Sequence, residues 1–257
     1  MTTSNNANYE DSSVISSYKK KDKLTPPEQT ILNLIQKENL SSMLDIGVGT
    51  GRTTIYFAPI FKEYMGIDYS HGMVEASKER FSNFPEYRFE LQDATDLSAF
   101  KENSFDFILF SFNGIDCVSY ANRLKILAEI KRVGKPGSYF AFSTHNIYNV
   151  PVLFSFQMPR NPLKYYNEYK RYKGVNKLNP PKEEILKNDF FSLFDGDINF
   201  SAAYLYYKPE KQISELKENK FENIRFFSLK TGKEIKTGTT WEHIKDPWLY
   251  FLCTNKK

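Results

Sequence analysis

Cysteine is scarce in this chain, and long apolar runs are missing from it. Cys117 and Cys253 are the two cysteines among 257 residues, and they lie far apart within apolar stretches. Such a pair is typical of buried, reduced thiols in a cytoplasmic protein rather than of a disulfide-stapled one. The longest apolar stretch is about the length of one strand, so the sequence predicts no membrane-spanning segment.

Charge of one sign is not gathered into blocks. The formal net charge is +4, and lysines are interspersed with acidic residues. A mixed surface of this kind is typical of a solvated protein rather than of one that binds nucleic acid. The first 17 residues are polar and rich in serine and asparagine, without the charged and apolar parts of a secretory signal. We therefore expect a cytoplasmic protein that binds neither nucleic acid nor membrane.

What the chain does contain is a glycine-rich turn between an apolar segment and a helix-forming one. Asp45 ends the apolar segment, and Gly47, Gly49 and Gly51 follow at alternate positions. Glycine lacks a Cβ atom and tolerates positive φ, so this turn lets the backbone approach a nucleotide-like ligand. Arg52 stands where a dinucleotide fingerprint has its third glycine. The acid inside the motif favours a ligand with a sulfonium and an amino group over one with phosphates.

Acidic residues also follow the next two predicted strands. Residues 64–68 form a short strand that ends on Asp68, where a carboxylate can accept hydrogen bonds from both hydroxyls of a ribose. Ser70 is already a good cap for the next helix, which leaves Asp68 for that role. Residues 87–91 alternate as a third strand, and Asp93 follows it.

This pattern resembles the class I S-adenosylmethionine-dependent methyltransferases. The glycine turn matches their motif I, and Asp68, Ser70 and Met73 fit the family's Asp-x-Ser-x-x-Met. The resemblance covers residues 25–145 and, less closely, the last two strands. It implies that S-adenosylmethionine is the cofactor and S-adenosylhomocysteine the product.

The resemblance also assigns residues to the cofactor. It implies that Asp93 contacts the adenine amine and that Ala94 contacts the ring, with Asp96 in the same loop as a competing candidate. The full set of residues predicted to bind the cofactor is Asp45, Gly47, Gly49, Thr50, Gly51, Arg52, Asp68, Tyr69, Met73, Asp93, Ala94, Ser111, Phe112 and Tyr18.

Five strand and helix units in succession predict a doubly wound α/β fold. Residues 105–110 have the apolar character of a central parallel strand, and residues 139–143 form a fifth strand. In the family, two C-terminal strands, here residues 221–227 and 248–253, close the sheet as an antiparallel hairpin. We therefore expect a Rossmann-like, mostly parallel sheet of seven strands, with the ligand site at the carboxyl ends of the strands.

The chain divides into four parts around this core. Residues 1–24 form an N-terminal arm, which acts as a lid in many small-molecule members of the family. Residues 25–145 are the cofactor-binding core, and residues 208–257 complete its sheet. Residues 146–207 are a substrate-binding cap inserted after the fifth strand, rich in Phe, Tyr, Asn, Lys and Pro and with an extra strand over 200–207.

The acceptor side has weaker signals. In-line methyl transfer needs mainly positioning, about 3 Å from nucleophile to carbon, and a site that excludes water. His145 is the one catalytic candidate; it either accepts a proton at neutral pH or shapes the pocket by hydrogen bonding. Asn113 and Asp116 either orient a substrate hydroxyl or amine or cap the next helix. The residues predicted to bind the acceptor are Asn113, Asp116, His145, Tyr9, Tyr165, Tyr169 and Trp241.

These observations predict an enzyme of class EC 2.1.1 that methylates a small metabolite or natural-product intermediate, with N-methylation ahead of O-methylation. The Asn/Asp-Pro-Pro-aromatic motif of nucleic-acid amine methyltransferases does not follow the fourth strand, and Asn179-Pro180-Pro181 lies in the cap instead. Clustered carboxylates for a metal are also missing there, so no metal is predicted. The alternatives are a nucleic-acid or protein methyltransferase, an NAD-dependent oxidoreductase and a non-catalytic S-adenosylmethionine-binding module. Either a monomer or a homodimer fits.

Overall fold

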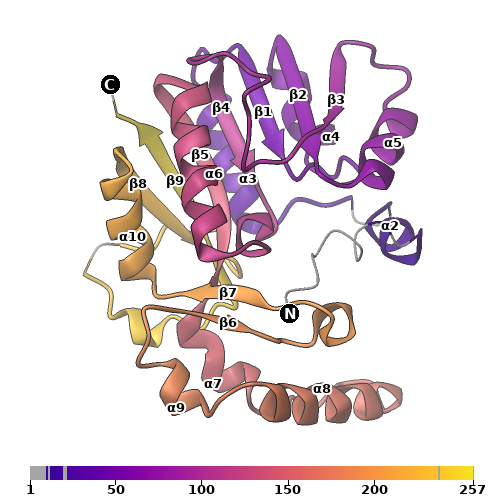
Figure 1. Ribbon diagram of the computed structural model, residues 1–257, viewed down its shortest axis with the longest axis vertical. Coiled ribbons are helices and arrows are strands. Elements are labelled where there is room, and N and C mark those ends of the chain that lie inside the picture. Colours follow the sequence, from indigo (N-terminus) through magenta and orange to yellow (C-terminus); the bar gives the residue numbers. More distant parts are fainter. Residues whose placement is uncertain (1–9, 11, 20–21, 237, 257) are drawn as a thin grey trace.

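A twisted sheet with helices on both faces forms the core of the protein (Figure 1). The computed structural model describes residues 10, 12–19, 22–236 and 238–256. Five strands pair in parallel in the order β3-β2-β1-β4-β5, the doubly wound arrangement that the sequence predicts. Their bounds are β1 Ser42–Ile46, β2 Glu63–Asp68, β3 Tyr87–Leu91, β4 Phe105–Phe110 and β5 Gly134–Asn146.

The C-terminal strands close the sheet as the family resemblance implies. Strand β8 (Phe221–Ser228) pairs antiparallel with β9 (Trp248–Asn255), and β9 pairs antiparallel with β5. The mostly parallel sheet with an antiparallel C-terminal hairpin is therefore confirmed.

Within the described residues the sheet has nine strands rather than the seven predicted, because a hairpin of the cap joins it. This cap hairpin consists of β6 (Phe190–Leu193) and β7 (Tyr204–Tyr207). Strand β4 ends opposite Phe142, so the last residues of β5 have no partner from β4 on that edge. Strand β7 occupies the free edge in parallel, with His145 opposite Tyr206.

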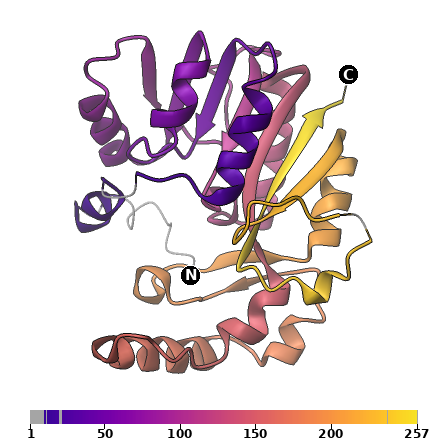
Figure 2. The same cartoon turned by 180° about the vertical axis from the view of Figure 1, so that it is seen from behind.

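Helices on the two faces of the sheet bury separate apolar clusters. Ile126, Ile130 and Leu216 from α6 and α10 pack on one face, and Ile31 and Val74 from α3 and α5 pack on the other (Figures 1 and 2). The bounds are α3 Pro26–Ile35, α4 Thr54–Phe57, α5 His71–Arg80, α6 Tyr120–Val133 and α10 Pro209–Glu218. None of the helices in the described ranges is long and apolar enough to cross a bilayer.

The cap helices cover the outer side of the cap hairpin. Val175 and Ile185 pack there against Leu193, Tyr204 and Tyr206. On the other side of the cap hairpin, α2 of the N-terminal arm lies beside α5 and faces the loop between β6 and β7 (Figure 1). The remaining bounds are α2 Ser12–Lys19, α7 Val150–Leu153, α8 Tyr165–Leu178, α9 Lys182–Ile185, and the 3-10 turns η1 Ala58–Ile60, η2 Gly114–Asp116, η3 Ile147–Asn149, η4 Pro162–Lys164, η5 Asp197–Phe200 and η6 Trp241–His243.

Candidate active site

A cavity of about 1150 Å³ lies at the carboxyl ends of the parallel strands, between the core and the cap hairpin. Ligands bind at this edge in open α/β sheets, because the loops after neighbouring strands converge there. Ten of the residues predicted to bind the cofactor line the cavity: Gly47, Gly49, Asp68, Tyr69, Met73, Asp93, Ala94, Ser111, Phe112 and Tyr18.

The glycine turn presents its backbone to this cavity. The backbone φ angles of Gly47 and Gly49 are 64° and 58°, and residues with a Cβ atom rarely adopt such positive values. A Cβ on Gly47 would come within 3.0 Å of the Phe110 ring, and one on Gly49 would lie 3.7 Å from the ring of Tyr18. Glycine at position 47 therefore avoids a tight contact with β4, and at position 49 it is the positive φ that favours glycine.

Asp68 connects the glycine turn to the start of α5. Its Oδ2 accepts a hydrogen bond from the Gly49 N–H at 2.9 Å, and its Oδ1 accepts one from the Ser70 N–H at 3.0 Å. The residue is 6% exposed, and this burial raises the pKa of its carboxyl group against the opposing effect of the backbone N–H groups of Ser70, Gly49 and Tyr69. Each carboxylate oxygen has capacity for a further hydrogen bond. Asp68 can therefore receive hydroxyl donors from a ligand in the cavity.

Three other motif residues lie behind the turn and do not line the cavity. The Asp45 carboxylate is buried and accepts hydrogen bonds from the hydroxyls of Thr53 at 2.6 Å and Tyr64 at 2.9 Å. Thr50 is buried, and a Cβ on Gly51 would meet the Phe81 ring at 2.3 Å. The positions of these residues indicate that they hold the turn in place rather than contact a ligand.

Arg52 also points away from the cavity. Its guanidinium forms two hydrogen bonds with the buried carboxylate of Glu28, at 2.7 and 2.6 Å, and donates to Ser111 Oγ at 3.1 Å. It stacks 4.4 Å from the centre of the Phe112 ring. Burial alone would raise the pKa of Glu28, but Arg52 holds that pKa below its usual value. Arg52 thus fixes the two cavity-lining residues after β4 from behind.

The ion pair between Glu28 and Arg52 was not predicted from the sequence. Glu28 completes a capping box with Thr25 at the start of α3, where its Oε2 accepts a hydrogen bond from the Thr25 N–H at 2.7 Å. The same carboxylate accepts the Tyr250 hydroxyl at 2.9 Å. No sequence pattern links a residue of α3 to one 24 positions later, so tertiary structure alone gives this contact.

Asp45 is expected to reduce the stability of the protein as the pH rises. Burial raises its pKa from 3.8 to about 6, although the hydroxyls of Thr53 and Tyr64 act in the opposite direction. The folded protein then holds the proton more tightly than the unfolded chain. Asp45's contribution is therefore present below about pH 4 and is lost towards about pH 6, a loss of roughly 2 to 3 kcal/mol. Across this range the free energy of unfolding of Asp45→Asn should rise relative to the parent protein, measured by denaturant titration.

A matched control for that experiment is Asp106→Asn. Burial would raise the pKa of Asp106, but the ammonium of Lys135 at 2.8 Å and the N–H groups of Ser41 and Ser42 outweigh it and lower the pKa. The stabilising contribution of Asp106 is therefore lost as the pH falls. The two variants should deviate from the parent protein with opposite slopes. Parallel slopes would contradict the raised pKa of Asp45.

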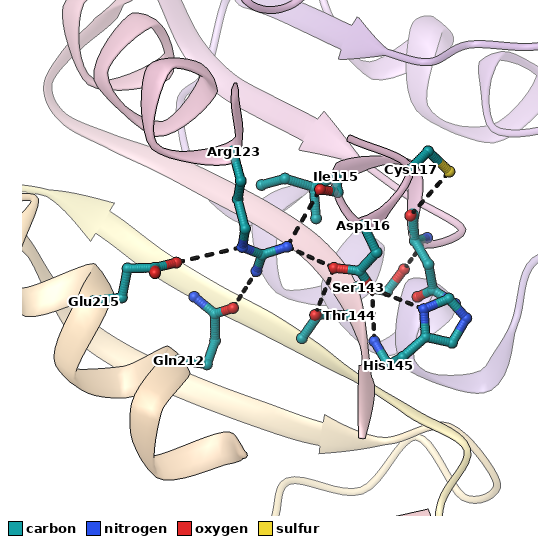
Figure 3. A network of polar contacts seen from close by, with 10 residues as sticks. Ile115, Asp116, Cys117, Arg123, Ser143, Thr144, His145, Gln212 and Glu215 are labelled. Carbon is teal, nitrogen blue, oxygen red and sulfur yellow. Dashed lines mark hydrogen bonds and ion pairs between the residues drawn. The ribbon is translucent and has the colours of Figure 1, made fainter. Parts of the chain in front are cut away.

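Asp116 is buried in a polar network and does not line the cavity (Figure 3). Its Oδ1 accepts from the Arg123 guanidinium at 2.5 Å and from the Thr144 hydroxyl at 2.8 Å. Its Oδ2 accepts from the His145 backbone N–H at 2.7 Å and pairs with the ring Nδ1 at 2.9 Å. Arg123 also reaches Glu215 at 3.3 Å. With both oxygens used twice, Asp116 has no free position for an acceptor.

His145 and Asn113 lie behind the cavity wall. Because a carboxylate can only accept, the His145 Nδ1 carries the hydrogen that binds Asp116, and Nε2 is left to accept from Asn113 Nδ2 at 3.2 Å. The imidazole stacks on Tyr206 with 4.6 Å between ring centres. Neither His145 nor Asn113 lines the cavity, whereas Phe112 does. This geometry favours the second of the two predicted roles, in which His145 shapes the pocket by hydrogen bonding.

The remaining residues predicted to bind the acceptor also lie elsewhere. Tyr165 and Tyr169 are exposed on α8, which covers the outer side of the cap hairpin. Trp241 packs on Phe226 with 4.7 Å between ring centres. Tyr165, Tyr169 and Trp241 do not line the cavity, which argues against direct contact with the acceptor. Tyr9 lies outside the described residues.

Aromatic residues missed by the sequence analysis form the wall opposite the cofactor residues. Tyr120 of α6 stacks on Phe190 of β6, with ring centres 4.4 Å apart and an angle of 19°. Phe191, Phe194 and Leu205 line the same part of the cavity. The sequence analysis predicted one extra strand in the cap and missed its partner β6. A predicted hairpin of both strands would have indicated that these aromatic side chains lie beside the cavity. Among the described residues, no group of three or more His, Cys, Asp or Glu side chains is placed to hold a metal ion.

Comparison with known proteins places this site in a family. Residues 44–142 match the model of a methyltransferase domain. A demethylmenaquinone methyltransferase from Staphylococcus aureus is 30% identical over 188 residues, which cover 65% of this chain and 76% of the relative. A probable S-adenosylmethionine-dependent methyltransferase from Saccharomyces cerevisiae is 29% identical over 157 residues, or 59% of this chain. The match spans only half of the yeast relative's length.

Solved structures share the fold at low sequence identity. An S-adenosylmethionine-dependent methyltransferase from Clostridium acetobutylicum matches with a TM-score of 0.61 and 16% identity, over 90% of this chain and 92% of its own. The 1,6-didemethyltoxoflavin-N1-methyltransferase from Burkholderia thailandensis, with bound S-adenosylhomocysteine, matches with a TM-score of 0.60 and 14% identity, over 98% and 85%. The cavity lined by Gly47, Gly49, Asp68 and Asp93, together with the Staphylococcus aureus relative and the matched methyltransferase domain, shows that the chain belongs to the class I S-adenosylmethionine-dependent methyltransferases.

Proposed function

We propose that the protein transfers a methyl group from S-adenosylmethionine to a ring nitrogen or hydroxyl of a small, uncharged aromatic molecule. The observation that carries this proposal is the composition of the cavity wall. Among the described residues that line the cavity, Asp68 and Asp93 are the ones with charged side chains, and both belong to the predicted cofactor site. The opposite part, which we call the acceptor end, is lined by Tyr120, Phe190, Phe191, Ser192, Phe194, Ser201, Ala202, Ala203 and Leu205.

The uncharged acceptor end selects against a cationic acceptor. An ammonium group taken out of water costs several kcal/mol unless a carboxylate or several hydrogen bonds replace its hydration. No carboxylate lines the acceptor end in the described part of the chain. The stacked rings of Tyr120 and Phe190 instead offer a flat apolar surface, on which a planar ring can stack. A neutral aromatic molecule fits these walls.

The residues at the other part of the cavity fit the family's cofactor. Gly47 and Gly49 bring their backbone to the cavity, and Asp68 keeps acceptor capacity for the two hydroxyls of a ribose. Asp93 and Ala94 line the cavity after β3, where the family binds the adenine. The bound cofactor supplies an electrophilic methyl group on a sulfonium. The task of the protein is then to bind, orient and exclude water.

Tyr18 supports a role for the N-terminal arm in excluding water. The residue lines the cavity from α2, and burial raises the pKa of its hydroxyl to about 12. Asp197, in the loop between β6 and β7, raises that pKa further, which places this loop near Tyr18. The arm and the cap hairpin therefore approach each other over the cavity.

The acceptor end holds no side chain suited to remove a proton at neutral pH. Histidine, lysine and carboxylate groups are missing from the described residues of its wall. A ring nitrogen with a free lone pair, or a hydroxyl acidic enough to ionise unaided, is therefore a better nucleophile here than an ordinary alcohol. Related proteins act on small acceptors too: one is named for demethylmenaquinone, and another was crystallised with 1,6-didemethyltoxoflavin.

Transfer of labelled methyl groups to a panel of acceptors tests the proposal. We expect turnover with uncharged heteroaromatic compounds and phenols, and little with aliphatic amines, oligonucleotides or protein. Tyr120→Leu should raise the KM of the best acceptor about two- to tenfold, because the stacking contribution is lost. Tyr166→Leu, a change of the same kind at an exposed position on α8, serves as the control. Preferential methylation of nucleic acid or protein, or equal KM values for the two variants, would contradict the proposal.

A further inference from the structure

Large apolar side chains are exposed on one stretch of the cap. Met158 and Leu163 precede α8 and are 75% and 89% exposed, and Tyr166 in the first turn of the helix is 62% exposed. Tyr165 is beside them. Outside this stretch, none of the large apolar side chains in the described residues is more than 53% exposed. Single exposed apolar residues need no explanation, but a contiguous group marks an interaction surface.

The same stretch carries the net positive charge of the protein. Residues 158–178 hold six of the 35 basic residues and one of the 31 acidic ones, so their net +5 exceeds the +4 of the whole chain. The one acid, Glu168, is paired with Arg171 at 2.6 Å. The other basic residues are exposed and form no ion pair within the described ranges; they are Arg160, Lys164, Lys170, Lys173 and Lys177.

The basic and aromatic side chains lie on the same side of the helix. The Lys170 ammonium is 4.5 Å from the centre of the Tyr166 ring, and that of Lys173 is 4.9 Å from the Tyr169 ring. Helix α8 lies at the outer edge of the cap in both views, with the cap hairpin between it and the core (Figures 1 and 2). Val175 anchors its inner side.

We propose that this outer cap surface, residues 158–178, docks the protein on an anionic lipid bilayer. Lysines and arginines beside a membrane are attracted by anionic headgroups, and tyrosines concentrate at the level of the headgroups. Met158 and Leu163 are exposed in the segment that leads into α8, and their burial among acyl chains would add apolar contact area. A surface contact of this kind needs no membrane-spanning helix. The prediction that the sequence has no membrane-spanning segment is therefore compatible with docking on a bilayer surface.

Two other occupants fit the surface less well. Nucleic acid would match the lysines and stack on the tyrosines, but it would leave the aliphatic Met158 and Leu163 without a partner. A second copy bound through the same surface would bring identical patches together in a twofold contact. Five unpaired positive charges from each copy would then face each other. An anionic bilayer satisfies both the charge and the apolar side chains.

Sedimentation of the full-length protein with lipid vesicles tests this inference. We expect binding to vesicles of phosphatidylcholine and phosphatidylglycerol in equal parts, little binding to phosphatidylcholine alone, and weaker binding as salt is added. The triple variant Lys164→Gln, Lys170→Gln and Lys173→Gln should bind the mixed vesicles at least about tenfold more weakly. The variant Leu163→Ser with Tyr166→Ser should also bind more weakly than the parent protein when the two are compared at the same salt concentration, because it loses apolar contact area and keeps its charge.

The matched control removes the same charge elsewhere. Lys37→Gln, Lys62→Gln and Lys101→Gln change exposed lysines near the amino ends of strands, at the opposite edge of the sheet, and should leave vesicle binding unchanged. Unaltered affinity for S-adenosylhomocysteine would show that each variant is folded. This measurement does not depend on which acceptor the protein methylates. Equal loss in the two triple variants would overturn the inference. The inference would also be overturned if an oligonucleotide displaced the protein from vesicles that carry the same total charge. A dimer that the variant Leu163→Ser with Tyr166→Ser abolishes would overturn it as well.

Discussion

Replacement of Arg123 by leucine is expected to lower the free energy of unfolding by about 3 to 5 kcal/mol. The guanidinium is fully buried and pairs with Asp116 at 2.5 Å and with Glu215 at 3.3 Å. It also donates to the side-chain amide of Gln212. Leucine would remove the cation from between two buried carboxylates and leave their charges without compensation. The cost comes from these uncompensated groups rather than from the lost attraction alone.

Denaturant titration at neutral pH measures this cost, with Arg225→Leu as the control. Arg225 forms a pair with Glu234 at 2.6 Å, but both side chains are exposed. Such surface pairs contribute about 0 to 1 kcal/mol. A cost for Arg123→Leu no larger than that for Arg225→Leu would show that the buried network does not support the fold. Adding Asp116→Asn to Arg123→Leu should recover part of the lost stability, because one uncompensated charge is removed.

Replacement of Asp68 by alanine is expected to weaken the binding of S-adenosylmethionine about a hundredfold or more. The family resemblance assigns both ribose hydroxyls to this carboxylate, and a hydrogen bond to a charged group contributes about 1.5 to 3 kcal/mol. Alanine would remove both acceptors from the cavity wall. Calorimetric titration with S-adenosylmethionine and, separately, with S-adenosylhomocysteine gives the two dissociation constants.

The control for this experiment is Asp96→Ala. Asp96 is exposed in the loop after β3 and does not line the cavity, so its removal should leave the affinity unchanged. Asp68→Ala also removes the partner of the Gly49 and Ser70 N–H groups, so unfolding of the free protein is measured alongside. Unchanged affinity in a folded Asp68→Ala variant would remove Asp68 from the cofactor site.

The part of the cavity wall around the glycine turn was predictable because its geometry follows from local patterns. Gly47 follows β1, Asp68 ends β2 and Asp93 comes shortly after β3, and parallel strands bring their carboxyl ends to one edge of a sheet. Gly47, Asp68 and Asp93 therefore meet around one cavity although they are distant in sequence. The three positions can be read from strand endings without knowledge of any long-range contact.

The acceptor end was not predictable, because it depends on which edges of the sheet remain free. The cap hairpin joins β5 only because β4 ends opposite Phe142 and leaves the edge beyond it open to β7. This placement brings Phe190 onto Tyr120 of α6, 70 positions earlier in the chain. It also puts α8 on the outside, away from the cavity, where Tyr165 and Tyr169 are exposed.

The doubly wound core and the methyltransferase family could be identified from the order of amino acids, because strand periodicity and glycine turns act over a few residues. Which acidic residues line the cavity depends on contacts between distant parts of the chain. Asp68 and Asp116 are both acids that follow core strands, yet Asp68 lines the cavity and Asp116 is enclosed. The guanidinium of Arg123 on α6 neutralises Asp116 inside the core. Asp68 instead accepts hydrogen bonds from backbone N–H groups and remains accessible from the cavity.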